Sequence, residues 1–285
     1  MLMTETTSHW QGSLDLAFRP QGDRTQMYRT YAKAPLKIQR PFYPENPAVC
    51  HSVSLHTAGG MVGGDRLSQQ INLDRGSRAL MTTVAATKVY RSNGLEAEQK
   101  IKMTLGDRAV LEWLPQETIV FNNAQYRQHT RIDLAPTASL IAWDIVRLGR
   151  SARGETFIGG AFGQNLEVWQ NQQPLWIDRL WLPGNERIWH SENGLAQNPA
   201  IATLICFSPQ IEPEIIAQLR QCTPSEAAKV GITQTQGGGL LCRYRGQSTA
   251  AARQWLIQIW AMLRQSLWQT PVCIPRVWQL QSLQG

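Results

Sequence analysis

The sequence predicts a mainly β fold: a large, β-dominated single domain of two or more sheets, with a few helices mostly toward the C-terminus. Short apolar segments bounded by turn residues recur through residues 10–208, a spacing typical of a mostly antiparallel β architecture. Helical periodicity is concentrated in residues 209–285, the basic C-terminal part of the domain. The 285 residues are enough to bury a substantial core.

The predicted strands share a short length, apolar or alternating residues and flanking turn residues. They cover residues 14–18, 49–55, 70–73, 79–90, 98–105, 109–114, 128–134, 140–148, 166–169, 175–182 and 203–207. Because successive side chains of a strand point to opposite faces, the same alternation predicts which residues share a face.

The predicted helices follow the last of these strands. A short helix is expected over residues 213–221. Thr223-Pro224-Ser225-Glu226 combines a capping residue, a first-turn proline and a reciprocal glutamate, which together predict a second helix start. In residues 248–268, apolar side chains recur at the spacing of one helical face. They are Ala252, Trp255, Leu256, Ile259, Trp260, Leu263 and Leu267.

The last predicted helix also carries two arginines, Arg253 and Arg264, which we expect on a solvated face opposite the apolar one. A packed helix with a basic outer side is favoured over a membrane-surface helix. Three tryptophans on this helix (Trp255, Trp260 and Trp268) keep a protein-docking role open, because aromatic residues and arginine are enriched where proteins bind one another.

Composition narrows the class of protein. The net charge is +7, and every charged residue after Glu226 is basic, so we expect the C-terminal part to meet an acidic partner. The five cysteines form no Cys-x-x-Cys pair, which disfavours structural zinc and a disulfide framework. The N-terminus shows no signal-peptide pattern and no apolar run approaches the ~20 residues that span a bilayer, so we expect a cytoplasmic protein that does not bind membranes.

Two glycine pairs, Gly59-Gly60 and Gly63-Gly64, precede Asp65 in the segment LHTAGGMVGGDRL. Their spacing matches neither a dinucleotide-binding loop nor a nucleotide P-loop, and Asp65 would repel phosphate. A tight turn or bulge between strands is favoured for the glycines, and this interpretation leaves Asp65 unexplained.

Charged side chains also fall within predicted strands. Asp144 is the polar member of an otherwise apolar face in residues 140–148, and Asp178 lies between Trp176 and Leu180 on one face of residues 175–182. Lys88 and Thr87 fall on opposite faces of residues 79–90. A buried ion pair, such as Asp144 with Lys88, is the simplest explanation of one such residue. Several together, with Asp65, are typical of a site, cavity or passage.

Other candidate sites are weaker. Cys50, His51 and His56 lie close in sequence, but Cys50 and His51 point to opposite faces of a strand, so a strand histidine and a buried thiol are favoured over a metal site. Glu155 is expected in a loop, pinned by Arg150 or Arg153. No nucleophile motif or catalytic acid pair stands out, so we predict no active site.

Six sequence blocks occur in an order that resembles the UreD family of urease accessory proteins, called UreH in some bacteria. They are residues 36–44 (LKIQRPFYP), the Gly-Gly-Met-Val-Gly-Gly-Asp segment, and residues 87–92 (TKVYRS), 111–118 (LEWLPQET), 148–157 (LGRSARGETF) and 275–278 (PRVW). Ala58, Val277 and Asp178 depart from the residues that are usual in that family.

The resemblance implies a non-enzymatic maturation factor with a β-dominated fold and no permanently bound cofactor. It implies binding to the urease apoprotein and to UreF, which recruits the GTPase UreG carrying nickel, and an internal passage for transient nickel. On this basis we expect acidic way-stations at Asp65, Asp144 and Asp178, with Thr87 or Lys88 tuning charge and Glu155 a further functional candidate. The residues expected to dock UreF are Arg253, Arg264, Trp255, Trp260, Arg276 and Trp278.

Three alternatives remain at this point. A rigid assembly scaffold could open the apoenzyme without conducting metal. Nucleic-acid binding would suit the charge and the tryptophans, but no recognisable module is present. A metal-dependent hydrolase using Asp65 and Glu155 is disfavoured, because no histidine clusters with them in the sequence.

Overall fold

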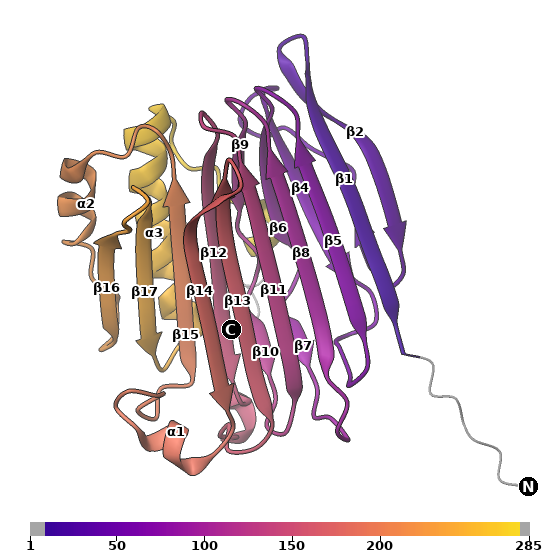
Figure 1. Ribbon diagram of the computed structural model, residues 1–285, viewed down its shortest axis with the longest axis vertical. Helices are drawn as coiled ribbons and strands as arrows, with labels where there is room; N and C mark the ends of the chain where they lie inside the picture. The colour runs from indigo at the N-terminus through magenta and orange to yellow at the C-terminus, as the bar shows by residue number, and fades with distance from the viewer. Residues whose placement is uncertain (1–8, 280–285) are drawn as a thin grey trace, which may run out of the picture.

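The computed structural model describes residues 9–279, whose strands form two facing sheets (Figure 1). Sheet I has seven strands. Their order is β14 (Gln173–Pro183), β13 (Ala161–Gln170), β11 (Gln125–Leu134), β8 (Ala97–Leu105), β5 (Arg66–Leu73), β1 (Gln11–Gln21) and β2 (Arg24–Lys33). The predicted mainly β class is confirmed.

Sheet II is the larger sheet and includes strands from the C-terminal part of the chain. Its order is β16 (Lys229–Gln234), β17 (Leu240–Gly246), β15 (Ala200–Phe207), β12 (Ser139–Leu148), β9 (Val110–Trp113), β6 (Arg78–Thr83), β4 (Val49–His56) and β3 (Leu36–Ile38). Two short strands, β7 (Thr87–Val89) and β10 (Thr118–Val120), pair with each other, and β10 also pairs with β12.

The expectation of a mostly antiparallel architecture is wrong, because the centres of both sheets are parallel. Strands β5, β8, β11 and β13 pair in parallel in sheet I, as do β4, β6, β9 and β12 in sheet II. The chain alternates between the sheets, so each return to a sheet runs in the direction of the previous strand. Antiparallel pairs flank these centres, as in β1–β2 and β13–β14.

Most predicted strands are confirmed, but residues 79–90 divide into β6 and β7. Strands β2, β3, β10, β16 and β17 were not predicted from the sequence. β2 and β16 are edge strands whose side chains are mostly exposed, so they have no apolar alternation to detect.

Two predicted helices are confirmed as α2 (Pro213–Leu219) and α3 (Thr249–Trp268). The Ser248 hydroxyl caps α3 by accepting a hydrogen bond from the Ala251 N–H. The predicted helix start at Thr223 is wrong. Glu226 instead accepts hydrogen bonds from the Tyr244 hydroxyl and from the Ser248 N–H, so its carboxylate supports the start of α3. The short helices α1 (Glu186–His190) and α4 (Arg276–Gln279) complete the α-helices described.

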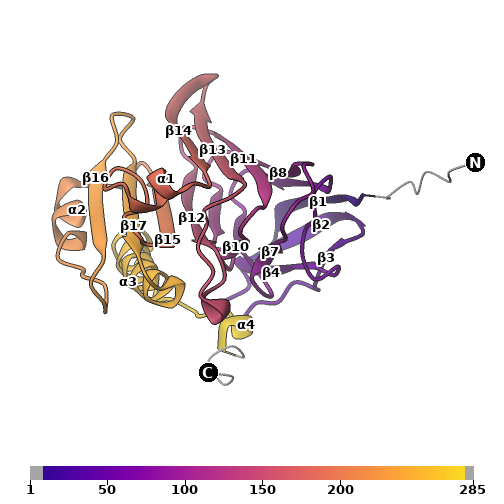
Figure 2. The ribbon, with the colours of Figure 1, turned by 90° about the horizontal axis from the view of Figure 1, so that it is seen from below.

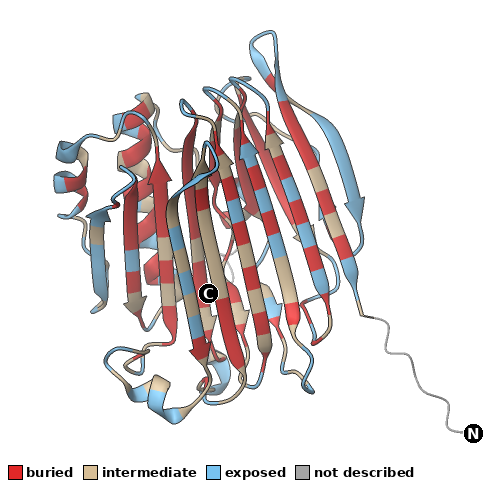
Figure 3. Ribbon diagram, in the orientation of Figure 1, coloured by how far each residue is buried: buried red, intermediate tan, exposed pale blue. Residues whose placement is uncertain are grey.

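Two apolar cores separate three layers, as Figure 2 shows: sheet I, sheet II, and α3 on the far side of sheet II. β12 contributes to both cores. Leu140 and Val146 face sheet I, whereas Ile141 and Trp143 face α3. Figure 3 shows the resulting alternation of buried and exposed residues along the strands of sheet I.

The expected solvated basic face of α3 is wrong. Arg264 is 0% exposed, and its guanidinium lies 2.5 Å from Glu45 Oε2 and 3.5 Å from Glu112 Oε2. Arg253 pairs with Glu117 and is largely buried. The tryptophans predicted to dock UreF, Trp255, Trp260 and Trp278, are buried as well. Of the six residues predicted for docking, Arg276 is the exposed one.

No helix in residues 9–279 is long and apolar enough to cross a membrane.

Candidate functional site between the sheets

A row of glutamines crosses the inner face of sheet I at one level. Gln99 of β8 pairs in register with Gln128 of β11, which pairs with Gln164 of β13. Leu67 and Leu180 occupy the same level on the strands to either side. Because these positions alternate with outward-facing ones, the three amides point into the apolar space between the sheets, where polar groups need partners.

The amides find their partners in a hydrogen-bonded network that reaches sheet II. The Tyr126 hydroxyl lies 2.9 Å from Gln99 Oε1 and 3.1 Å from Gln128 Oε1, and its one hydrogen can serve either. Gln128 Nε2 donates to Asp144 Oδ2 on β12, and Gln164 Nε2 donates to the same oxygen at 2.7 Å. We call Gln99, Tyr126, Gln128, Asp144 and Gln164 the polar chain.

The polar chain joins two cavities. The first, of about 650 Å³, is lined by Gln99 together with Gly59, Gly60, Thr87 and Lys88. The second, of about 280 Å³, is lined by the other end of the chain, Asp144 and Gln164, together with Thr203 and Arg243. Polar groups therefore link one cavity to the other through an otherwise apolar core.

Asp144 is the acidic member of the polar chain. Burial raises the pKa of its carboxyl to about 6, and the hydrogen bonds from Gln128, Gln164 and the Ile145 N–H oppose that rise. Burial also raises the pKa of Tyr126 well above its ordinary value, and the nearby Asp144 adds to the effect. The predicted face for Asp144 is confirmed, but its observed partners are amides rather than Lys88, and these amides offset part of the cost of burying the charge without neutralising it.

Asp65 closes the glycine-rich turn. Its side chain is 1% exposed, and its two oxygens accept hydrogen bonds of 2.8 Å from the N–H groups of Val62 and Trp10. Gly60 has a φ of 154°, and a Cβ there would lie 2.6 Å from the carbonyl oxygen of Lys88. The predicted turn is confirmed, and it packs against the strand that carries Thr87 and Lys88 to the first cavity.

His56 contributes an imidazole to the first cavity. Burial lowers the pKa of this side chain, and the nearby Asp65 carboxylate opposes the effect, so the ring is neutral at pH 7. Its Nε2 is buried and has no hydrogen-bond partner among residues 9–279. The wall of this cavity thus includes an imidazole, a side chain that can bind a borderline metal ion, with one ring nitrogen that no described residue engages.

The other predicted acids lie elsewhere. Asp178 Oδ2 is 2.6 Å from Arg243 Nη2, so it neutralises a cation that lines the second cavity. Glu155 is tied to Arg150 by side-chain contacts of 2.8 and 2.9 Å, as the sequence predicted, and this bond holds a local loop. The structure therefore brings Gly59, Gly60, Thr87 and Lys88 together at the first cavity and places Asp144 at the second.

Gln99, Gln128, Gln164 and Tyr126 were not predicted from the sequence. Gln99 lies between the buried Ala97 and Ile101 on one face of β8, and Gln128 lies between Tyr126 and Thr130 on one face of β11. The alternation that marks Asp144 therefore also marks these two uncharged residues, so a sequence signal for both glutamines exists.

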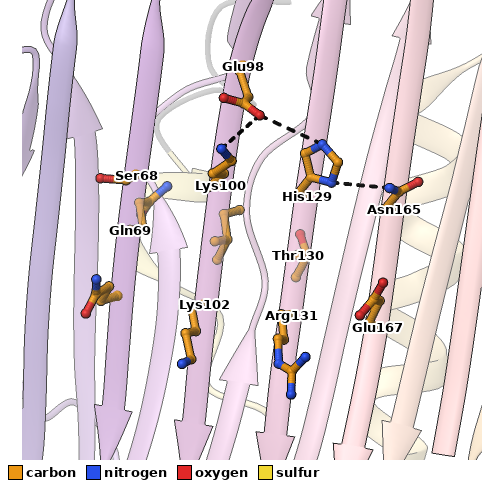
Figure 4. A pocket seen from close by; sticks show the side chains of 12 residues that line it. Ser68, Gln69, Glu98, Lys100, Lys102, His129, Thr130, Arg131, Asn165 and Glu167 are labelled. Atoms are coloured by element: carbon orange, nitrogen blue, oxygen red, sulfur yellow. Dashed lines mark hydrogen bonds and ion pairs between the residues drawn. The ribbon is translucent and has the colours of Figure 1, made fainter. Parts of the chain in front are cut away.

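A third depression, of about 560 Å³, lies on the outer face of sheet I (Figure 4). Its polar groups contact one another: Glu98 Oε1 lies 3.1 Å from Lys100 Nζ, and His129 Nδ1 lies 3.2 Å from Asn165 Nδ2. This recess is separate from the polar chain, which lies on the inner face.

Comparison with known proteins gives one consistent result. A family model described as UreD urease accessory protein matches residues 11–279. Three similar proteins carry the name urease accessory protein UreD. The one from Nostoc punctiforme is 51% identical over 271 residues, covering 95% of this chain and 96% of that protein. The one from Trichormus variabilis is 49% identical over 270 residues, with the same coverage. The one from Dechloromonas aromatica is 40% identical over 277 residues, covering 96% of each.

Proposed function

Because the chain belongs to the UreD family of urease accessory proteins, we propose that it acts in urease maturation and supplies an internal route for nickel to the apoprotein. The observation that carries the proposal is the polar chain, which links two cavities across the apolar space between the sheets. In this proposal the protein is no enzyme: it binds nickel transiently and supports assembly of the carbamylated dinickel centre.

The donor groups suit a borderline divalent cation that must be released again. The His56 imidazole offers nitrogen at the first cavity, the amides of Gln99 and Gln128 offer neutral oxygens, and Asp144 offers a carboxylate. Conduction requires several sites that each hold the ion weakly. Amide oxygens meet this need, and the un-neutralised Asp144 provides the attraction that draws a cation inward.

The partners in this proposal are UreF, the GTPase UreG through UreF, and the urease apoprotein subunits, in the cytoplasm and without nucleic acid or membrane. Trp255, Trp260 and Arg264 are buried and Arg253 is largely buried, so this proposal does not use these side chains to dock UreF. Arg276 stays available for a partner, because its side chain is exposed.

The second candidate function is a rigid scaffold that opens the apoenzyme without conducting metal. One observation favours it: the amides of the polar chain already bond to one another and to Asp144, so an ion must replace those bonds. A scaffold requires that the two sheets stay packed together, and apolar residues could hold them as well as polar ones.

Replacement of Gln128 by leucine separates the two functions. Gln128→Leu removes both the donor to Asp144 and the acceptor for Tyr126, at a nearly equal side-chain volume. Thr130→Val is the matched control, because it is the next inward-facing buried residue on β11. Both variants should co-purify with UreF and urease.

The measurement is nickel per urease active site after maturation in cells that carry each variant. The conduit predicts normal loading with Thr130→Val and a loss of most nickel with Gln128→Leu. Full loading with Gln128→Leu, in a complex of normal composition, would exclude the conduit and leave the scaffold.

A further inference from the structure

A second group of potential metal ligands lies outside the polar chain. Glu45 comes from the loop before β4, His51 from β4, and Cys273 from the segment between α3 and α4. One ligand atom from each lies within 4.8 Å of the other two. Glu45 and His51 lie six residues apart, but Cys273 comes from the other end of the chain, so local spacing does not predict the group of three.

His51 has an unmet bonding capacity in this group. Its side chain is 1% exposed, and Nε2 lies 2.6 Å from Glu45 Oε1. The other ring nitrogen, Nδ1, is buried and has no hydrogen-bond partner among the residues described. Because Nδ1 makes no such bond, it can carry the ring hydrogen while Nε2, which faces Glu45, binds a metal ion.

The charges around the group accommodate a cation. Arg264 lies 2.5 Å from Glu45 Oε2 and holds that oxygen, which leaves Oε1 directed to His51. Arg264 and Arg78 place positive charge beside the group, and the Glu45 carboxylate places negative charge within it. Burial raises the pKa of the neighbouring Glu112, and Arg264 opposes that rise. The thiolate that forms when Cys273 binds metal offsets part of the charge of the incoming ion.

We propose that Glu45, His51 and Cys273 bind one divalent transition-metal ion of the zinc type. The ligand set combines carboxylate oxygen, imidazole nitrogen and thiolate sulfur, a mixture typical of Zn²⁺, and water from the partly open Cys273 side completes a tetrahedron. On binding, the Cys273 S–H bond breaks and its proton passes to solvent. The hydrogen that His51 Nε2 shares with Glu45 Oε1 moves to Nδ1, and the metal ion takes its place between Nε2 and Oε1. The bound ion ties the segment after α3 to β4.

The test uses the full purified chain, treated with a chelator and then titrated with Co²⁺ as a spectroscopic substitute for Zn²⁺. We expect one ion per chain and a near-ultraviolet thiolate-to-cobalt charge-transfer band that Zn²⁺ removes. Cys273→Ala should abolish the band and weaken Zn²⁺ binding at least about tenfold. Cys222→Ala is the matched control, because Cys222 is also a partly buried thiol but contacts Met262 instead.

Three results would overturn the site: no charge-transfer band in the unmodified chain, an unchanged band in Cys273→Ala, or equal loss in Cys222→Ala. His51→Gln gives an independent reading, since it should weaken Zn²⁺ binding while leaving the thiol in place. The site shares no residue with the polar chain. Zinc affinity and nickel loading of urease can therefore fail separately, and Gln128→Leu should leave the cobalt band unchanged.

Discussion

Replacement of Arg264 by methionine tests whether the buried charges beneath α3 are mutually compensating. The side chain is 0% exposed and bonded to Glu45, with Glu112 also close. Methionine keeps much of the length but removes the positive charge. Breaking a buried pair by removing one partner typically costs about 3–5 kcal/mol, because the remaining charge is left uncompensated.

The stability deficit should depend on pH in a defined direction. The Arg264 cation lowers the pKa of Glu112 against the upward effect of burial, and it helps to lower the pKa of Glu45. Without it, the folded-state pKa of Glu112 rises further above that of the unfolded chain, and the folded-state pKa of Glu45 rises from its lowered value. An acid with a raised folded pKa loses stability as pH rises through the interval between the two pKa values. The deficit of Arg264→Met should therefore be larger at pH 8 than at pH 5.5.

Urea unfolding followed by tryptophan fluorescence measures this deficit. Arg276→Met is the control, because Arg276 is exposed and surface substitutions usually change stability by less than about 0.5 kcal/mol. Adding Glu112→Gln to Arg264→Met should recover part of the loss, since it removes one uncompensated carboxylate. A deficit below about 1 kcal/mol, or one that grows as pH falls, would refute the reasoning.

Two further predictions concern the candidate site. Gly60→Ala should lower the free energy of unfolding by about 2–3 kcal/mol, because the new Cβ meets the Lys88 carbonyl. Gly59→Ala should lower it by only about 1 kcal/mol, because its positive φ is strained for alanine but its surroundings are open. Equal urea midpoints for the two variants would contradict this prediction. Asp144→Asn should stabilise the fold at pH 8 but not near pH 4. The folded-state pKa of Asp144, about 6, exceeds its ordinary value, so the carboxylate costs stability once it ionises. A stability difference from the unmodified chain that does not change with pH would contradict this prediction.

Strand positions could be predicted from this sequence, but strand direction could not. Alternation and turn residues report where the chain is extended and which side chains share a face, as residues 140–148 illustrate. They do not report whether the next strand joins the same sheet or the opposite one. The glycine-rich segment after β4 illustrates the problem, because it leads the chain across to β5 of sheet I rather than into a hairpin.

Arg264 shows a different limit. It follows Trp260 by four residues, about one helical turn, and so belongs on the apolar face by the same spacing that identified that face. Its charge predicted an exposed side chain, because its compensating partner Glu45 lies 219 residues away in the chain and gives no local signal. Alternation marks Asp144 and Gln128 each as a polar residue on a buried strand face, but it does not pair them, because Gln128 and Gln164 come from the opposite sheet.

The buried acids beneath α3 and the buried acid between the sheets have different partners, and the difference bears on function. Beneath α3, Glu45 and Glu112 lie beside Arg264, so the charges compensate one another and the arrangement suits a structural role. Between the sheets, Asp144 is held by two amides that donate hydrogen bonds but carry no charge. A purely structural carboxylate gains more from a cationic partner than from amides. A carboxylate that must attract a passing cation has to keep its negative charge, and amide donors preserve that charge while offsetting part of the cost of burial. The choice of partners at Asp144 therefore favours the conduit over the scaffold.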